Sequence, residues 1–155
     1  MTIIYLACPY TSPYPAVSYE RQLLATQAAA VLAEEGHTVF SPITHGHQLA
    51  PYLHPDNLHS HDFWMAQCLP ILTKCSLFLI LPLPGWRESK GVEVEAQHAL
   101  LHRINGAFFQ NPPEGKFPML EVVSKDAATK YFLEELFKLT AGIPTHEGAP
   151  NAFQH

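Results

Sequence analysis

Short apolar runs recur along the chain, and each is followed by turn-forming or polar residues. The clearest runs are Ile3–Cys8, His37–Ser41, Leu77–Leu81 and Gly106–Phe109, and a weaker one is Met119–Val123. Apolar, partly β-branched runs of four to eight residues bounded by Pro or Gly are typical of buried strands. The pattern therefore predicts five strands, of which residues 77–81 read as buried on both faces.

Longer segments between these runs have apolar residues at helical spacing. Leu24, Ala28, Val31 and Leu32 indicate a helix over about Val17–Glu35, with Gly36 as the residue after its end. Further helices are predicted at Phe63–Lys74, where Pro70 marks a kink or a restart, at Lys90–His102 and at Ala127–Leu139. Strands that alternate with helices predict a single α/β domain over residues 1–141 with a parallel sheet, followed by a tail over 142–155.

Residues 42–61 show neither a strand-like apolar run nor helical spacing of apolar residues, and they are rich in His and Pro. We therefore expect a long irregular loop there. Imidazole and carboxylate groups are common ligands of zinc and iron. One hypothesis is therefore a metal-dependent hydrolase that uses His45, His47, His59, His61 and Asp62. The alternatives are that these histidines stack on or hydrogen-bond to a heterocyclic ring, or are simply exposed.

Composition narrows the class of protein. A chain of 155 residues with 47% hydrophobic content is long enough for one domain with a substantial core. The net charge of −5 argues against a nucleic-acid-binding surface but not against a small phosphorylated ligand. Three cysteines without paired spacing indicate neither a disulfide framework nor a zinc ribbon. Neither a membrane-spanning run nor a signal peptide is evident, so we expect a cytoplasmic protein without a membrane partner.

The segment after the apolar run at 77–81 combines a Pro-Gly turn with the start of a helix. Ser89 is a plausible N-cap, which would leave free backbone N–H groups near Ser89, Lys90 and Gly91 and favour an anion. Helical side chains lean towards the N-terminus, so the Glu95 carboxylate should lie over Gly91 and be uncovered. Glu93 should point towards Ser89 instead. Either acid could alternatively be placed there only for the helix dipole.

The loop that follows the predicted strand at Ile3–Cys8 should lie at the same edge of the sheet as Ser89. Tyr5, Tyr10, Thr11 and Ser12 are then expected near Ser89, because ligands of parallel α/β proteins bind at the carboxyl ends of the strands. Tyr5 could equally be a core tyrosine whose hydroxyl is satisfied internally.

Three motifs in this order resemble those of the nucleoside 2-deoxyribosyltransferase superfamily, which includes nucleotide N-glycosidases. They are I-Y-L-A-C-P-Y at Ile4–Tyr10, G-H-x-V-F-S-P-I at Gly36–Ile43 and P-G-W-x-x-S-x-G-x-x-x-E at Pro84–Glu95. The combination is similar to that of a small, mostly uncharacterised branch of the superfamily. The resemblance covers about two thirds of the chain and implies a flavodoxin-like (Rossmann-like), doubly wound, five-stranded parallel sheet in three layers.

The resemblance also implies residue roles. Glu95 would be the nucleophile, Tyr5 would position its carboxylate, and Ser89 would contact the 5′ end of the sugar, where a serine is typical of hydrolases of nucleoside 5′-monophosphates. Relatives usually carry an aspartate that protonates the departing base, and here the aligned residue is Cys68, with Asp62 the nearest upstream carboxylate. Including the loop expected to form the base pocket, the candidate substrate-binding residues are Ser89, Gly91, Lys90, Trp86, Pro9, Tyr10, His45 and His47.

The function that we expect is hydrolysis of the base–sugar bond of a (deoxy)nucleoside 5′-monophosphate through a covalent glycosyl-glutamate intermediate. The alternatives are a nucleoside 2-deoxyribosyltransferase and a catalytically weak nucleotide-binding module, the latter motivated by Cys68. The only partners expected are a small nucleotide or nucleoside and, as the resemblance implies, further copies of the chain in a homodimer or larger homo-oligomer. No cofactor is expected.

Overall fold

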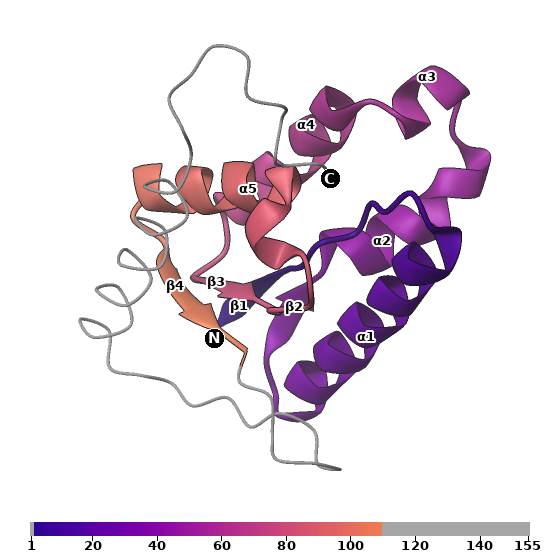
Figure 1. The fold of residues 1–155 in the computed structure, drawn as a ribbon. Coiled ribbons are helices and arrows are strands. Elements are labelled where there is room, and N and C mark those ends of the chain that lie inside the picture. The colour runs from indigo at the N-terminus through magenta and orange to yellow at the C-terminus, as the bar shows by residue number, and fades with distance from the viewer. Residues whose placement is uncertain (1, 110–155) are drawn as a thin grey trace.

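A computed structural model describes residues 2–109 of the chain. Its sheet has four parallel strands: β1 (Ile3–Ala7), β2 (Thr38–Phe40), β3 (Leu77–Ile80) and β4 (Asn105–Phe108), in the order β2-β1-β3-β4 (Figure 1). The prediction of an α/β domain with a parallel sheet is confirmed, together with the first four strands. The predicted strand at 119–123, the predicted helix at 127–139 and the tail lie outside the described residues.

Within residues 2–109, five helices accompany these strands: α1 (Pro15–Glu34), α2 (Pro42–Leu49), α3 (Pro55–Leu58), α4 (His61–Leu72) and α5 (Lys90–Leu101), with 3-10 turns η1 (Ala50–Tyr52) and η2 (Trp86–Glu88). Gly36 has a φ of +90°, which confirms its predicted place after the end of α1. Helix α4 continues through Pro70 instead of restarting there.

The prediction of an irregular loop at residues 42–61 is wrong, because α2, η1 and α3 occupy most of it. The Ser41 side chain accepts a hydrogen bond from the backbone N–H of Thr44, and Pro42 occupies the first turn of α2. An N-cap serine followed by proline is a helix-start signal. The prediction missed this signal because the segment is rich in His and Pro. The helix is also only eight residues long, which is too short for a clear apolar periodicity.

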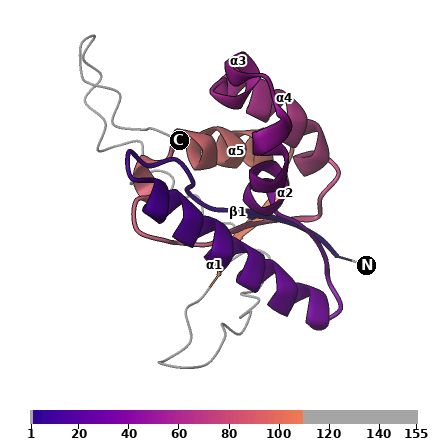
Figure 2. The same cartoon turned by 90° about the vertical axis from the view of Figure 1, so that its right-hand side faces the viewer.

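Alternate side chains of the central strands pack into two separate hydrophobic clusters. Ile4, Leu6 and Leu79 pack with Ala25, Ala28 and Leu32 of α1. Tyr5, Ala7, Phe78 and Ile80 pack instead with residues of α4 and α5. Figure 2 shows α1 on one side of β1 and α4 and α5 on the other. The period-2 alternation thus gives each central strand two buried faces, as the uninterrupted apolar run of β3 predicts.

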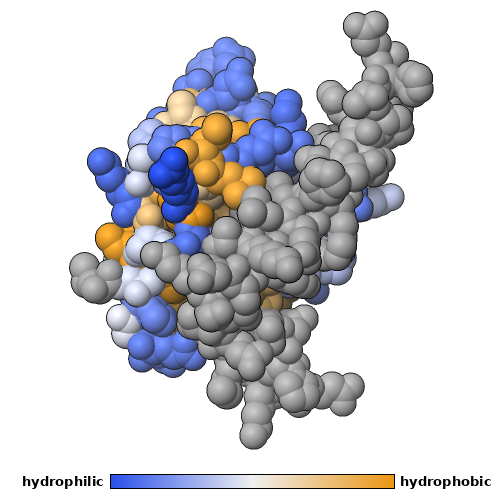
Figure 3. All heavy atoms as spheres, turned by 90° about the vertical axis from the view of Figure 1, so that its left-hand side faces the viewer, coloured by the Kyte–Doolittle hydropathy of each residue, from blue (hydrophilic) through white to orange (hydrophobic). Residues whose placement is uncertain are grey.

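The buried face of α1 differs from the predicted one. Ala28 and Leu32 are buried as the helical spacing predicts, whereas Leu24 is 38% exposed and Gln22 and Ala25 are buried in its place. The surface in Figure 3, seen from the side where β4 lies in Figure 1, shows hydrophobic residues in several places between hydrophilic ones. Among residues 2–109, no helix has both the length and the apolar character needed to cross a membrane.

Candidate active site

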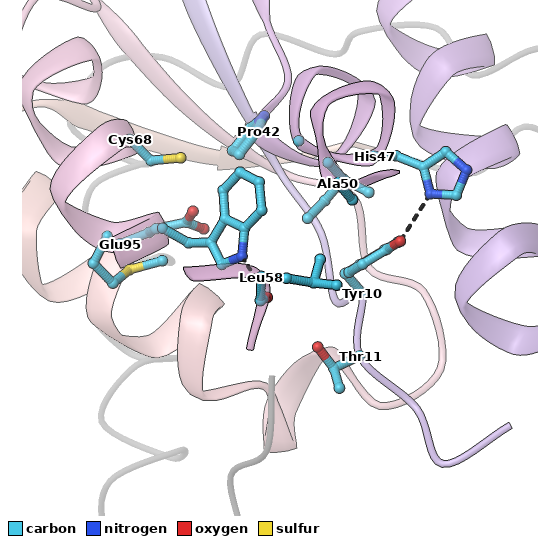
Figure 4. Close-up of a pocket in the computed structure, with 12 residues that line it drawn as sticks. Tyr10, Thr11, Pro42, His47, Ala50, Leu58, Cys68 and Glu95 are labelled. Atoms are coloured by element: carbon cyan, nitrogen blue, oxygen red, sulfur yellow. Dashed lines mark hydrogen bonds between the residues drawn. The ribbon is translucent and has the colours of Figure 1, made fainter. Parts of the chain in front are cut away.

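A cavity of about 110 Å³ lies at the carboxyl ends of the strands (Figure 4). Strand β1 has β2 on one side and β3 on the other, so the chain changes direction across the sheet at this edge. Parallel α/β proteins bind ligands at such switch points. The cavity is lined by residues that follow β1 and β2 and by residues of α3, α4 and α5: Tyr10, Thr11, Pro42, Ile43, Gly46, His47, Ala50, Leu58, Trp64, Met65, Cys68 and Glu95.

The Glu95 carboxylate is held by a tyrosine of the central strand. The Tyr5 hydroxyl donates a hydrogen bond of 2.7 Å to Oε1 of Glu95. Tyr5 is completely buried, and its ring lies against Phe40 and Phe78 on the two neighbouring strands. The position of the carboxylate is therefore fixed by a fully buried side chain of the central strand.

Burial determines the charge of this carboxyl group. Desolvation raises the pKa of Glu95 from 4.5 to about 8, and the hydrogen bond from Tyr5 opposes that rise. Glu95 is only 3% exposed, so the prediction of an uncovered side chain is wrong, although the carboxylate does line the cavity. A buried acid whose pKa lies near neutrality beside a cavity is typical of catalytic sites.

Cys68 lies beside this pair. Its thiol interacts with the Tyr5 hydroxyl, and burial together with the nearby Glu95 raises the pKa of the thiol to about 12. The thiol therefore keeps its proton near neutral pH, and it is neither a thiolate nucleophile nor a strong acid. Cys8, Cys68 and Cys75 are all buried and free.

Two polar rings lie across the cavity from Glu95. The Tyr10 hydroxyl lies 2.8 Å from Nδ1 of His47, and the two rings meet edge to face (Figure 4). Burial raises the pKa of Tyr10. This pair places hydrogen-bonding groups at the end of the cavity that is remote from the carboxylate.

The indole of Trp64 lines the cavity as well. Its Nε1–H donates to the Leu58 carbonyl at 3.0 Å, which fixes the ring. A Cβ atom on Gly46 would come within 3.2 Å of the indole, so the glycine allows α2 to approach the ring closely. Met65, Ile43 and Leu58 complete the apolar lining.

The start of α5 agrees in part with the sequence prediction. Ser89 is the N-cap, and its buried side chain accepts a hydrogen bond from Val92 N–H at 3.3 Å. The Ser89 N–H is not free, because it donates to the Trp86 carbonyl. Glu93 accepts a hydrogen bond from the side chain of Gln97, one turn further along the helix, and does not line the cavity.

Several other predicted site residues do not line the cavity. His45, Asp62 and Lys90 are exposed. Pro9 and Gly91 are buried outside it, and Trp86 packs edge to face on Phe108 in the core. Of the predicted set, the structure thus brings together Tyr5, Tyr10, His47, Cys68 and Glu95.

The metal hypothesis is not supported by the arrangement of the histidines. Across residues 2–109, which include all five proposed ligands, no three His, Cys, Asp or Glu side chains form a group that could hold a metal ion. His54, which the hypothesis did not include, lies 3.4 Å from Asp56, and both are exposed.

Sequence reasoning missed the residues that give the cavity its shape. Trp64, Met65 and Leu58 were assigned to a helix or a loop without a functional role. The available signal was an exceptionally apolar first turn, Phe63-Trp64-Met65, directly after a polar His-Ser-His-Asp segment. This signal marks an apolar start of the helix but does not tell which ring faces the site.

The fold and the site define a parallel α/β protein with an enclosed carboxylate at the switch point of its sheet. The chain belongs to the family described as domain of unknown function (DUF1937), which it matches over residues 2–108. That match spans every described element and every residue of the cavity. No curated protein matches the chain.

Proposed function

We propose that this protein is an N-glycosidase that hydrolyses the base–sugar bond of a (deoxy)nucleoside 5′-monophosphate, with Glu95 as nucleophile. The observation that carries the proposal is the buried Tyr5–Glu95 pair beside a cavity. Cleavage of an N-glycosidic bond passes through an oxocarbenium-like state, which a fixed carboxylate stabilises and can trap covalently.

The proposed reaction has two displacements at C1′. First, a carboxylate oxygen of Glu95 bonds to C1′ while the C1′–N bond breaks, and the base leaves with the bonding electron pair and takes up a proton from solvent water. A water molecule then bonds to C1′ while the bond from C1′ to the carboxylate breaks, and it releases its proton to solvent, which yields the sugar phosphate with net retention and frees Glu95. Tyr5 keeps the carboxylate oriented throughout, because its ring is locked between two strands.

The lining of the cavity is suited to a heterocyclic base. An aromatic ring with a fixed orientation, Trp64, offers a stacking surface, and stacking of a base on an aromatic side chain contributes about 1–3 kcal/mol. The Tyr10–His47 pair supplies hydrogen-bonding groups for the polar edge of the base. His45, which is exposed, has no part in this arrangement.

The monophosphate is the less direct part of the proposal. It is supported by the position of Glu95 on α5, a 12-residue helix whose N-terminus begins at the buried N-cap Ser89. The backbone N–H groups and the dipole at such a terminus favour an anion. In the resemblance noted above, a serine at this position is likewise associated with monophosphate substrates.

The finer description of the fold belongs to the same proposal. We propose that the four strands are part of a five-stranded, flavodoxin-like sheet in three layers. The observed order β2-β1-β3-β4 equals the first four strands of the flavodoxin-like order 2-1-3-4-5. The segment at 119–123 would supply the fifth strand.

Cys68 favours one alternative function. The thiol holds its proton too firmly to protonate a leaving base efficiently, and Asp62 is exposed and does not line the cavity. A protein with this pocket but a weak acid could bind nucleotides with little turnover. It would then be stabilised by nucleotide without releasing product. A deoxyribosyltransferase, the second alternative, would use the same Glu95 chemistry with a base in place of water.

The test is a screen of the common nucleosides and their 5′-monophosphates for release of free base, with and without a second base. Free sugar phosphate identifies hydrolysis, and a newly formed nucleotide or nucleoside identifies transfer. Glu95→Gln should remove activity, whereas Glu93→Gln, a matched change on the same helix outside the cavity, should retain it. The proposal fails if no compound releases base or if Glu95→Gln retains full activity.

A further inference from the structure

The loops that follow β1 and β3 are joined by a single side chain of α1. Arg21 Nη1 donates to the Thr11 carbonyl at 2.9 Å and to the Tyr10 carbonyl at 3.3 Å, in the loop after β1. Its Nη2 donates to the Pro84 carbonyl at 2.8 Å, in the loop after β3. The guanidinium thus connects backbone segments that are more than 60 positions apart in sequence.

Both loops carry parts of the candidate site. Tyr10 and Thr11 line the cavity themselves (Figure 4). The loop with Pro84 leads through η2 into α5, which carries Ser89 and Glu95. The separation of the Tyr10 wall from the start of α5 is therefore fixed by one planar group, because an arginine presents its N–H donors in a rigid fork.

The absence of a side chain at Gly85 leaves room for the Arg21 guanidinium. The φ of this glycine is +88°, and a Cβ atom there would lie 2.8 Å from Nη2 of Arg21. Any side chain at position 85 would have to displace the guanidinium. Gly36 has nearly the same φ, +90°, but a Cβ atom there would meet nothing within 4 Å. A substitution at Gly36 would therefore cause backbone strain alone, whereas a substitution at Gly85 would cause the same strain and also crowd Arg21.

The bonding of Arg21 differs from that of a surface ion pair. In the part of the chain that the structure describes, its guanidinium has carbonyl partners and no carboxylate within ion-pair distance. The side chain is half-buried, and its charge lowers the pKa of the neighbouring Cys8 thiol, against the larger effect of burial. The charge strengthens each hydrogen bond, and the geometry directs all three at loop backbone.

We propose that Arg21 is a positioning residue that bridges the two loops and sets the width of the site between Tyr10 and α5. It does not line the cavity itself and acts through the carbonyl groups of Tyr10, Thr11 and Pro84. The expected effect of Arg21 on substrate binding rests on the proposed function, whereas the bridge between the two loops does not.

The first test measures amide hydrogen exchange in Arg21→Gln, Arg21→Lys and the wild type. Both variants should exchange about tenfold or more faster at residues 10–12 and 85–88, the factor expected when the charge-assisted hydrogen bonds of the guanidinium are lost. Arg21→Lys keeps the charge but not the planar fork. Lys74→Gln, which removes an exposed positive charge far along the sequence, is the control and should leave both loops unchanged. The proposal is overturned if either loop exchanges at the wild-type rate in Arg21→Gln. It is also overturned if either loop does so in Arg21→Lys.

The second test compares Gly85→Ala with Gly36→Ala in two backgrounds. In the wild type, Gly85→Ala should lower the urea unfolding midpoint more than Gly36→Ala does, because it adds crowding to the same backbone strain. In Arg21→Gln, the two substitutions should lower it by similar amounts. Equal effects in the wild type would overturn the proposal. This cycle needs only folded protein and remains informative if Arg21→Gln is itself less stable.

The third measurement links the bridge to substrate. With a nucleotide that the wild type hydrolyses, Arg21→Gln should raise KM about tenfold and change kcat much less, because the residue sets the width of the site and not the chemistry. An unchanged KM contradicts a positioning role. If the wild type hydrolyses no nucleotide, the proposed function fails, and the exchange and unfolding experiments still decide the bridge.

Discussion

The hydroxyl of Tyr5 and the carboxylate of Glu95 lie 2.7 Å apart although 90 positions separate them in the sequence. Tyr5 belongs to the central strand, and Glu95 lies in the second turn of α5. Their contact brings a neutral donor to a buried acid at one end of the cavity. The protonation state of Glu95 is the property on which the following two predictions depend.

Base release should depend on pH through Glu95. Since the attacking form is the carboxylate and burial raises its pKa to about 8, kcat/KM should increase as the pH rises towards 8 and level off above it. Tyr5→Phe removes the hydrogen bond that lowers this pKa, so its profile should be displaced to higher pH. Tyr52→Phe, at a side chain that is 89% exposed, is the control. Activity that falls through pH 8 would instead identify Glu95 as a general acid.

Stability should depend on pH through the same group. The folded-state pKa of Glu95 lies above its value of 4.5 in an exposed chain, so its contribution to stability is fully present below pH 4.5 and is lost as the pH rises through about 8. Glu95→Gln should therefore be nearly neutral at pH 4 and stabilise the protein by about a few kcal/mol at pH 9. Urea unfolding of Glu95→Gln and Glu93→Gln across this range measures it. A pH-independent effect of Glu95→Gln would contradict the raised pKa.

Trp64 should contribute to nucleotide affinity through its ring. Loss of base stacking corresponds to about 1–3 kcal/mol, which is roughly a 5- to 150-fold weaker Kd. Trp64→Leu should show this loss, whereas Trp64→Phe keeps an aromatic face and should show less. Both variants lack the indole N–H that bonds to Leu58, so the comparison isolates stacking. Calorimetric titration with the best nucleotide from the screen measures the difference, and equal affinities in the two variants would exclude stacking on this residue.

Cys68 should be dispensable as an acid. Its pKa of about 12 makes the thiol a poor proton donor, so Cys68→Ala should keep base release within a few-fold of the wild type. Cys68→Asp would place a second carboxyl group near Glu95 and Tyr5, where burial and the like charge keep it protonated at neutral pH. It should accelerate release of poorly leaving bases, by up to about 10²- to 10⁴-fold. A hundredfold loss in a folded Cys68→Ala variant would show that the thiol takes part in catalysis.

The local signals in the sequence were sufficient for the elements that carry the chemistry. Ser89 is the N-cap of α5, Gly36 follows the end of α1, and the uninterrupted run at 77–81 contains the buried strand β3. Each of these depends on a residue and its near neighbours, through capping, backbone dihedral angles or apolar periodicity. The segment at 42–61 failed because its composition concealed an equally local signal, the Ser41-Pro42 helix start.

The sequence by itself determined that this is an α/β protein with a parallel sheet and that Glu95 stands near the start of a helix after a buried strand. Only the tertiary structure decided that Glu95 is buried against Tyr5, that Trp64 and not His45 faces the cavity, and that Arg21 reaches both loops. Secondary structure follows from neighbours within a few positions. The burial of a carboxyl group, the choice of side chains that line a cavity and hydrogen bonds between distant loops all depend on how distant segments pack. No local sequence pattern contains that information.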